Sequence, residues 1–209
     1  GSAYHTGVMA KYVFEGIARV PVEVDLASEY RYRDPIFDRN TLVIIVSQSG
    51  ETADSLAALR ESKANGQRVL GIVNVVGSSI AREADNVMYT WAGPEISVAT
   101  TKAYSAQLAS FYLLAMKFGK VRKALADSDY EQMIGDLQQL PGMMEELLKD
   151  RQQIQRFANR YLAAEHIFFI GRGIDYAISM EGSLKLKEIS YIHSEAYAAG
   201  ELKHGTISL

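Results

Sequence analysis

The sequence predicts an α/β protein in which a parallel sheet has helices on both faces, in three layers. Three observations support this prediction. Short apolar runs rich in β-branched residues recur along the chain and fit buried strands, as at 42–46. A turn and then apolar residues at helical spacing follow this run. Strands that alternate with helices in this way pair in parallel, because each helix carries the chain back along the sheet.

The first expected elements lie before the apolar run at 42–46. Apolar residues at helical spacing predict an amphipathic helix over about residues 4–18. Residues 21–26 are expected to form a second short strand, and residues 31–35, which end in proline, a loop.

The strand at 42–46 opens the most regular part of the pattern. It continues into a helix that ends near residue 64, and the apolar residues within 68–74 predict the next strand. A Gly-Ser-Ser turn at 77–79 is expected to begin a short helix, followed by a strand at 86–91. A long helix is expected over about residues 98–118, with small and large apolar residues on its buried side.

The chain then changes in character. Residues 129–163 are charged and strand-free, and they predict two helices separated at Pro141-Gly142. A new apolar run at 166–170 predicts another buried strand, which is followed by a helix to about Ser190.

A weak internal repeat indicates two related units. A glycine, a helix and then a Ser-Glu pair occur from Gly1 to Ser28 and again from Gly171 to Ser194. By this comparison the first unit lacks a strand before Gly1, so we expect the chain to be a fragment. The expected organisation is a near-complete first unit over 1–128, a helical connection over 129–164 and the start of a second unit over 165–209.

Composition narrows the possible functions. The chain has 209 residues, 48% of them hydrophobic, and a net charge of −3 with both signs mixed, which argues against nucleic acid as a partner. No apolar run approaches the about 18 residues of a membrane span. The sequence contains no cysteine, which excludes disulfides, thiolate metal sites and a cysteine nucleophile and fits a reducing compartment such as the cytoplasm.

Polar residues gather directly after the strand at 42–46. Ser47, Gln48, Ser49 and Thr52 place uncharged donors where the following helix begins. A helix N-terminus favours anions, because its first amides lack partners and its dipole is positive there. These residues would suit a phosphate monoester held without a metal. The alternative is that Ser49 and Thr52 are only an ordinary helix cap.

A second group of charged residues lies on one predicted helix. Glu181, Lys185 and Glu188 have the spacing that places them on one helical face. A carboxylate beside an ammonium can move a proton on a carbon next to a carbonyl, and His204 could assist ring opening of a sugar. The alternatives are an exposed ion pair worth about 0.3–0.5 kcal/mol and an ordinary loop histidine.

Two motifs carry a resemblance to a known family. The run Ser-Gln-Ser-Gly-Glu-Thr at 47–52 resembles the phosphate loop of sugar isomerase (SIS) domains, which have a flavodoxin-like fold. The longer run from Glu181 to Gly205 resembles the isomerase domains of glucosamine-6-phosphate synthases, the glutamine:fructose-6-phosphate amidotransferases. The similarity extends over essentially the whole chain, including 27–33 and 98–103.

The resemblance implies a role for individual residues. The phosphate would be bound by Ser47, Gln48, Ser49 and Thr52. Ser2 occupies the position of a threonine that contacts the sugar phosphate, and Val98 matches a position whose backbone touches the sugar.

The resemblance also assigns the chemical steps. Glu188 matches the base that moves a proton between carbons 1 and 2, and Lys185 is the lysine beside it. His204 matches the histidine credited with ring opening, which in this family reaches into the neighbouring subunit, so a homodimer is implied. No metal or cofactor is implied.

The implied reaction converts fructose 6-phosphate and ammonia to glucosamine 6-phosphate, an aminotransferase and isomerase step of hexosamine biosynthesis in the cytoplasm, and glucose 6-phosphate is a further expected ligand. The family's glutaminase domain uses a cysteine, so ammonia must come from a domain outside this cysteine-free chain. The family's Schiff-base lysine near the C-terminus is also outside it, so we expect impaired turnover. The alternatives are a non-catalytic sugar-phosphate sensor and a fructosamine-phosphate deglycase.

Overall fold

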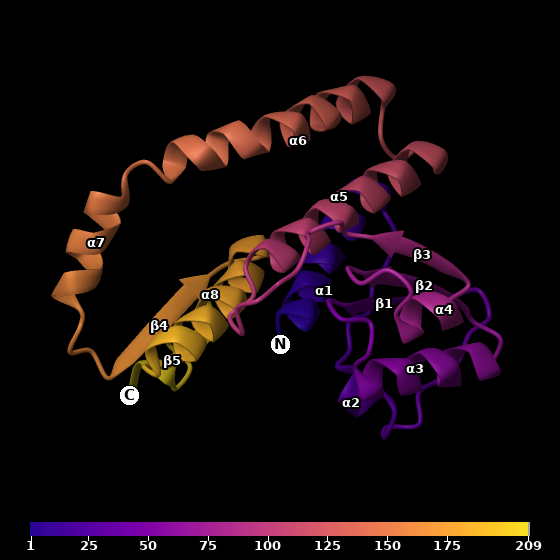
Figure 1. Cartoon of the computed structure of the whole chain (residues 1–209), viewed down its shortest axis with the longest axis horizontal. Coiled ribbons are helices and arrows are strands. Elements are labelled where there is room, and N and C mark those ends of the chain that lie inside the picture. Colours follow the sequence, from indigo (N-terminus) through magenta and orange to yellow (C-terminus); the bar gives the residue numbers. More distant parts are fainter. Residues whose placement is uncertain (209) are drawn as a thin grey trace. The chain divides into compact units, whose positions relative to one another are not determined.

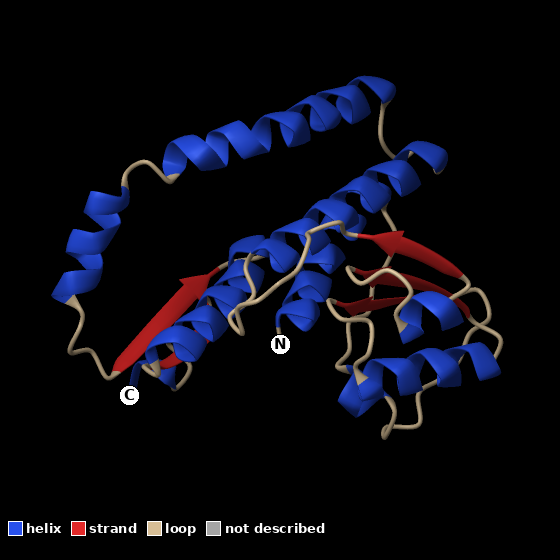
Figure 2. Ribbon diagram, in the orientation of Figure 1, coloured by secondary structure: helices blue, strands red, loops and turns tan. Residues whose placement is uncertain are grey.

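The computed structural model describes residues 1–208 and divides them into two structural units. Unit 1 comprises Gly1–Gly16 and Val20–Leu114, and unit 2 comprises Ile17–Arg19 and the chain from Ala115 onward. Figure 1 traces the elements in sequence order and Figure 2 distinguishes helices from strands. The elements are α1 (Ser2–Val13), the π-helical turn η1 (Phe14–Ala18), α2 (Ala27–Tyr30), β1 (Leu42–Ser47), α3 (Ala53–Ala64), β2 (Arg68–Val73), α4 (Ser79–Glu83), β3 (Asn86–Tyr89), α5 (Lys102–Val121), α6 (Asp127–Leu147), α7 (Arg151–Arg160), β4 (His166–Gly171), α8 (Ile174–Ser190), β5 (His193–Ala198) and η2 (Thr206–Ser208).

The sheet of unit 1 is parallel and has the order β1-β2-β3. Its strands confirm the apolar runs predicted from the sequence, and helices α3 and α4 provide the connections between them. The register pairs Ser47 with Val73 and Val73 with Tyr89. The last residues of the three strands therefore lie side by side, and the loops that follow them leave from one edge of the sheet.

Helices cover both faces of this sheet, as the three-layer prediction requires. Figure 2 shows α3 and α4 on one side of the strands, and α1 and the first part of α5 on the other. On the first side, Leu59, Val69 and Ile80 form a buried core with other apolar residues of α3, α4 and the strands. On the second side, the rings of Phe14 and Phe111 meet edge to face, with centroids 6.3 Å apart. The predicted α/β class is confirmed.

Unit 2 contains a strand–helix–strand motif. The strands β4 and β5 pair in parallel, and α8 connects them and packs on both. Gly182 of α8 lies against the ring of Phe169, where an added Cβ would be only 2.9 Å from the ring. The hydroxyl of Ser194 donates to Ser183 Oγ at 3.0 Å in the buried interface. Helices α6 and α7 of this unit bury none of their residues.

Two predictions for unit 1 are wrong. Residues 21–26 are not a strand, because the sheet order places only β2 beside β1 and leaves this segment without a paired neighbour among residues 1–208. The Val22 amide instead donates to Glu15 Oε1 at 3.3 Å. The expected equivalence of the two Ser-Glu pairs is also wrong, because Ser28 lies in α2, a helix that the sequence pattern does not predict, while Ser194 lies in β5.

In unit 2 the predicted position of the break between two helices is wrong. Helix α6 continues through Pro141, and the chain breaks between Leu147 and Arg151 instead. A proline has a φ close to that of a helix, and on an exposed helix the backbone groups it leaves unpaired are solvated. The new helix begins where Asp150 accepts a hydrogen bond from the Gln153 amide at 3.4 Å. Strand β5 was also not anticipated.

The packing of α4 gives a first test. Ile80 is fully buried and Ile36 is 97% exposed, so the same truncation should have different effects at the two positions. We expect Ile80→Ala to lower the free energy of unfolding by about 2–5 kcal/mol, the usual cost of emptying a core position. Ile36→Ala should be close to neutral. Urea unfolding followed by circular dichroism measures both, and equal effects would contradict the described core.

Candidate functional site

The polar loop at 47–52 folds into a tight turn after β1. Ser47 is buried, and its Oγ accepts a hydrogen bond from the Gly50 amide at 3.0 Å. The hydroxyls of Ser47 and Thr52 lie 3.3 Å apart, which closes the loop on itself. Gly50 has a φ of +68°, a left-handed conformation that favours glycine.

The ordinary-cap interpretation of this loop is wrong. Thr52 occupies the N-cap position of α3, but its side chain makes no capping hydrogen bond. Ser49 Oγ accepts from the Glu51 amide at 3.2 Å, which is a contact within the loop. Both residues are exposed beside the helix N-terminus, where amides and dipole favour an anion.

The loop after β2 supports the loop after β1. The Asn74 amide donates to the Gln48 carbonyl at 3.2 Å, and the Ile80 amide donates to the Gly50 carbonyl at 3.0 Å. An added Cβ at Gly50 would lie 2.1 Å from Ser78 Oγ. The backbone of the predicted phosphate loop is therefore fixed by hydrogen bonds and by close packing.

The side chain of Asn74 extends this support to the loop after β3. Its Oδ1 accepts from the Thr90 hydroxyl at 3.1 Å and from the Ala92 amide at 2.8 Å, and its Nδ2 donates to the Gly93 carbonyl at 2.7 Å. Sequence reasoning did not single out Asn74. The available signal was an amide residue directly after a buried strand, which is a common turn position.

Two of the predicted substrate-binding residues lie outside this loop. Ser2 is the first residue of α1, in unit 1. Val98 lies between β3 and α5 and is 91% exposed, and its carbonyl accepts a hydrogen bond from the Thr100 amide at 3.0 Å. Their contact with a sugar phosphate stays a prediction.

The charged cluster in unit 2 forms as its spacing predicts. Lys185 Nζ lies 2.5 Å from Glu188 Oε2 and 3.4 Å from Glu181 Oε1 on α8. The side chains of Lys185 and Glu181 are only 19% and 6% exposed. The alternative of an ordinary exposed ion pair is therefore wrong. Burial largely excludes water from the Glu181 carboxylate, so the Lys185 ammonium is needed to compensate its charge, whereas the Glu188 side chain is 26% exposed.

His204 does not lie on α8 with the charged cluster. It lies in the turn after β5, is exposed, and donates its backbone amide to the Glu201 carbonyl at 2.9 Å. The structure brings Lys185 and Glu188 together, but in residues 1–208 no hydrogen bond or ion pair links them to the His204 side chain. Its proposed role in ring opening is untested.

Residues 1–208 show the features of neither a metal site nor a membrane-spanning helix. No group of three or more histidine, aspartate or glutamate side chains there has an arrangement that could hold a metal ion. None of the helices in that range is both long and apolar enough to cross a membrane.

The parallel sheet and the loop at the N-terminus of α3 can be compared with known protein families. The family model described as "SIS domain" matches residues 1–117 and 161–209, which is most of the sequence. The chain belongs to the SIS domain family. This agrees with the resemblance carried by the motif at 47–52.

The names of individual relatives are more specific than the name of the family. The chain is 58% identical over 209 residues to glutamine–fructose-6-phosphate aminotransferase (isomerizing) of Clostridium acetobutylicum and 50% identical to that of Thermus thermophilus, covering 34% and 35% of their lengths. It thus spans about a third of these curated relatives. Among solved structures, the C-terminal domain of glucosamine-fructose-6-phosphate aminotransferase from Francisella tularensis has a TM-score of 0.97 and 42% identity, with 100% of this chain and 59% of that chain covered.

The contact between Gly50 and Ser78 gives a second test. Gly50 and Gly77 both have positive φ, but an added Cβ has no neighbour within 4 Å at Gly77 and collides with Ser78 at Gly50. We expect Gly77→Ala to cost about 1–2 kcal/mol from backbone strain alone, and Gly50→Ala to cost clearly more. Urea unfolding of both variants measures the difference. Equal costs would show that close packing does not constrain the loop.

Proposed function

We propose that this chain binds a hexose 6-phosphate and catalyses aldose–ketose isomerisation, as the isomerase part of an enzyme that makes glucosamine 6-phosphate from fructose 6-phosphate and ammonia. The observation that carries the proposal is the loop at 47–52, in which the exposed Ser49 and Thr52 lie beside the N-terminus of α3. The names of the relatives support the choice of substrate.

The phosphate end of the substrate binds the loop through neutral donors. Ser47, Gln48, Ser49 and Thr52 supply side chains, and the first amides of α3 point in the same direction. Hydrogen bonds to an ionised phosphate are stronger than neutral ones. Ser2 and the backbone of Val98 complete the binding of the sugar.

The chemistry takes place at the other end of the sugar. The Glu188 carboxylate carries a proton between carbons 1 and 2, and the Lys185 ammonium stabilises negative charge that develops on the substrate oxygen. The 2.5 Å distance between the two side chains supports this pairing. His204, contributed by a second copy in a homodimer, opens the sugar ring.

Other parts of the overall reaction lie outside this chain. The relatives are about three times as long, and we place the glutaminase domain that releases ammonia in the part of the native protein that corresponds to the remainder. No cofactor or metal is proposed for the isomerisation, because acid–base chemistry at Glu188 and Lys185 suffices for a proton transfer between adjacent carbons. The proposed location is the cytoplasm.

The phosphate loop is tested by removing hydroxyls. Ser49→Ala and Thr52→Ala should each weaken glucose 6-phosphate binding by about 1–2 kcal/mol, the range for hydrogen bonds to charged groups. Glucose itself should be little affected. Isothermal titration calorimetry measures both ligands, with Ser128→Ala in the exposed start of α6 as the control. Equal losses for both ligands would contradict phosphate binding at this loop.

The base is tested by Glu188→Gln. We expect this change to abolish exchange of the carbon 1 proton of bound fructose 6-phosphate with deuterated solvent, because an amide cannot accept that proton. The affinity for the sugar phosphate should change little. NMR follows the exchange, and Glu146→Gln on an exposed part of α6 serves as the control. Undiminished exchange in Glu188→Gln, or none in the unmodified chain, would refute the assignment.

A further inference from the structure

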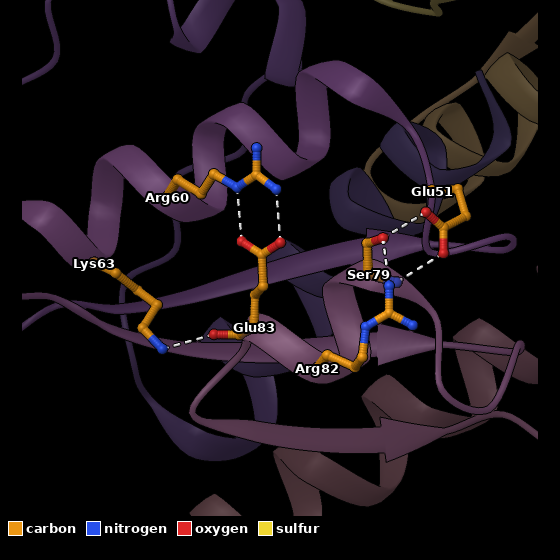
Figure 3. Close-up of polar contacts among 6 residues, drawn as sticks. All are labelled: Glu51, Arg60, Lys63, Ser79, Arg82 and Glu83. Carbon is orange, nitrogen blue, oxygen red and sulfur yellow. Dashed lines mark hydrogen bonds and ion pairs between the residues drawn. The ribbon is translucent and has the colours of Figure 1, made fainter.

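We propose that Glu51 is a positioning residue: its carboxylate clamps the phosphate loop to the start of α4 and so keeps the loop's hydroxyls in a binding arrangement. This inference rests on the proposed binding of phosphate at 47–52. It gives a role to a residue of the loop that binds no substrate itself. The contacts that make up the clamp are shown in Figure 3.

The clamp is bidentate. Glu51 Oε1 accepts a hydrogen bond from the Ser79 amide, and Glu51 Oε2 accepts one from the Ser79 hydroxyl, both at 2.7 Å. Both carboxylate oxygens are therefore engaged by one residue of α4. These two hydrogen bonds fix the position and the rotation of the Glu51 side chain, since a single contact would leave the carboxylate free to turn.

Arg82 holds the other side of the clamp. Its Nη2 donates to Ser79 Oγ at 3.1 Å, and its Nη1 donates to the Gly77 carbonyl. The hydrogen bonds from the Ser79 hydroxyl and amide lower the pKa of Glu51, and the nearby Arg82 adds to this effect. Glu51 is therefore ionised at neutral pH, and its charge is matched by a guanidinium on the side of α4.

The clamp explains an otherwise unexpected residue. A carboxylate within an anion-binding loop repels the anion if it points toward it. Here the carboxylate is directed to Ser79, on the element that follows the neighbouring strand. The electrostatic cost is thereby reduced, and the ionised side chain makes stronger hydrogen bonds to α4 than a neutral one would.

The hydrogen bonds of the loop fall into two groups, those to the segment 74–80 and those within the loop. The carbonyls of Gln48 and Gly50 and the side chain of Glu51 are bound to the segment 74–80. The three hydroxyls of the loop, at positions 47, 49 and 52, do not take part in these contacts. One set of groups thus anchors the loop to its neighbour, and the hydroxyls form hydrogen bonds within the loop, so their contact with a ligand does not require the anchor to be released. Preorganisation of this kind increases affinity, because binding does not have to order the loop.

A second pair on α4 provides a matched control. Glu83 binds Arg60 through two hydrogen bonds of 2.7 and 2.6 Å, and its carbonyl accepts from Lys63 Nζ at 2.6 Å. Figure 3 shows this pair at the far end of α4 from Glu51. It attaches α4 to α3, and the hydrogen bonds of Glu83 described in residues 1–208 go to α3 and not to the phosphate loop. Loss of the Glu83 side chain therefore loosens α4 without releasing the loop.

The experiment compares Glu51→Ala, Glu51→Gln and Glu83→Ala by calorimetric titration with glucose 6-phosphate and with inorganic phosphate. We expect Glu51→Ala to weaken both ligands by about tenfold. Glu51→Gln, which keeps one acceptor for Ser79, should lose less, and Glu83→Ala should bind as the unmodified chain does. Circular dichroism checks that each variant is folded. If Glu51→Ala does not fold, the ligand affinity of Glu51→Gln decides the result.

A double substitution separates positioning from general loss of stability. If Glu51 acts through the loop, Ser49→Ala should cost less affinity in the Glu51→Gln background than in the unmodified chain. Purely additive effects would overturn the proposal, as would equal losses in the Glu51 and Glu83 variants or tighter phosphate binding after the negative charge is removed.

The same measurements show whether a failure lies in the Glu51 clamp or in the assignment of the phosphate loop. If the unmodified chain does not bind either phosphate ligand, or if Ser49→Ala has no effect, the assignment of the phosphate loop fails. If Ser49→Ala weakens binding and both Glu51 variants bind normally, only the clamp fails.

Discussion

The parallel register of β1, β2 and β3 is the constraint on which the site of unit 1 depends. It aligns Ser47, Val73 and Tyr89, the last residues of three strands. The loops that follow must leave the sheet together, and the Asn74 amide and side chain then join them by hydrogen bonds. A one-residue slip would turn each side chain to the other face and separate these partners.

Unit 2 builds its charged cluster by another route. There the spacing along a single helix, α8, brings Lys185 between Glu181 and Glu188. Glu181 is buried, and α8 packs against β4 and β5, with Gly182 allowing close approach to Phe169. Local sequence thus sets which groups meet, and tertiary packing sets how little water surrounds them.

Much of the fold could be predicted because β1, β2 and β4 are apolar runs of strand length. The expected burial of β4 is wrong, since Phe168 and Ile170 are 36% and 47% exposed. The failures depend on distant contacts. Whether residues 21–26 form a strand depends on a neighbour that pairing must supply, and an exposed helix tolerates Pro141. Loop residues 47–52 could be found from their motif. Asn74 is harder to identify, because an amide residue after a strand is a common turn position and its contacts with two other loops appear only in the folded chain.

The close approach of Gly50 to Ser78 links the two positions in any attempt to redesign the loop at 47–52. Any side chain introduced at position 50 alone would collide with Ser78. A library of single substitutions in the loop therefore retains only glycine at this position. Productive diversity at that position requires a simultaneous change at residue 78 that makes room for it. Directed evolution of this loop would therefore proceed by coupled pairs of substitutions.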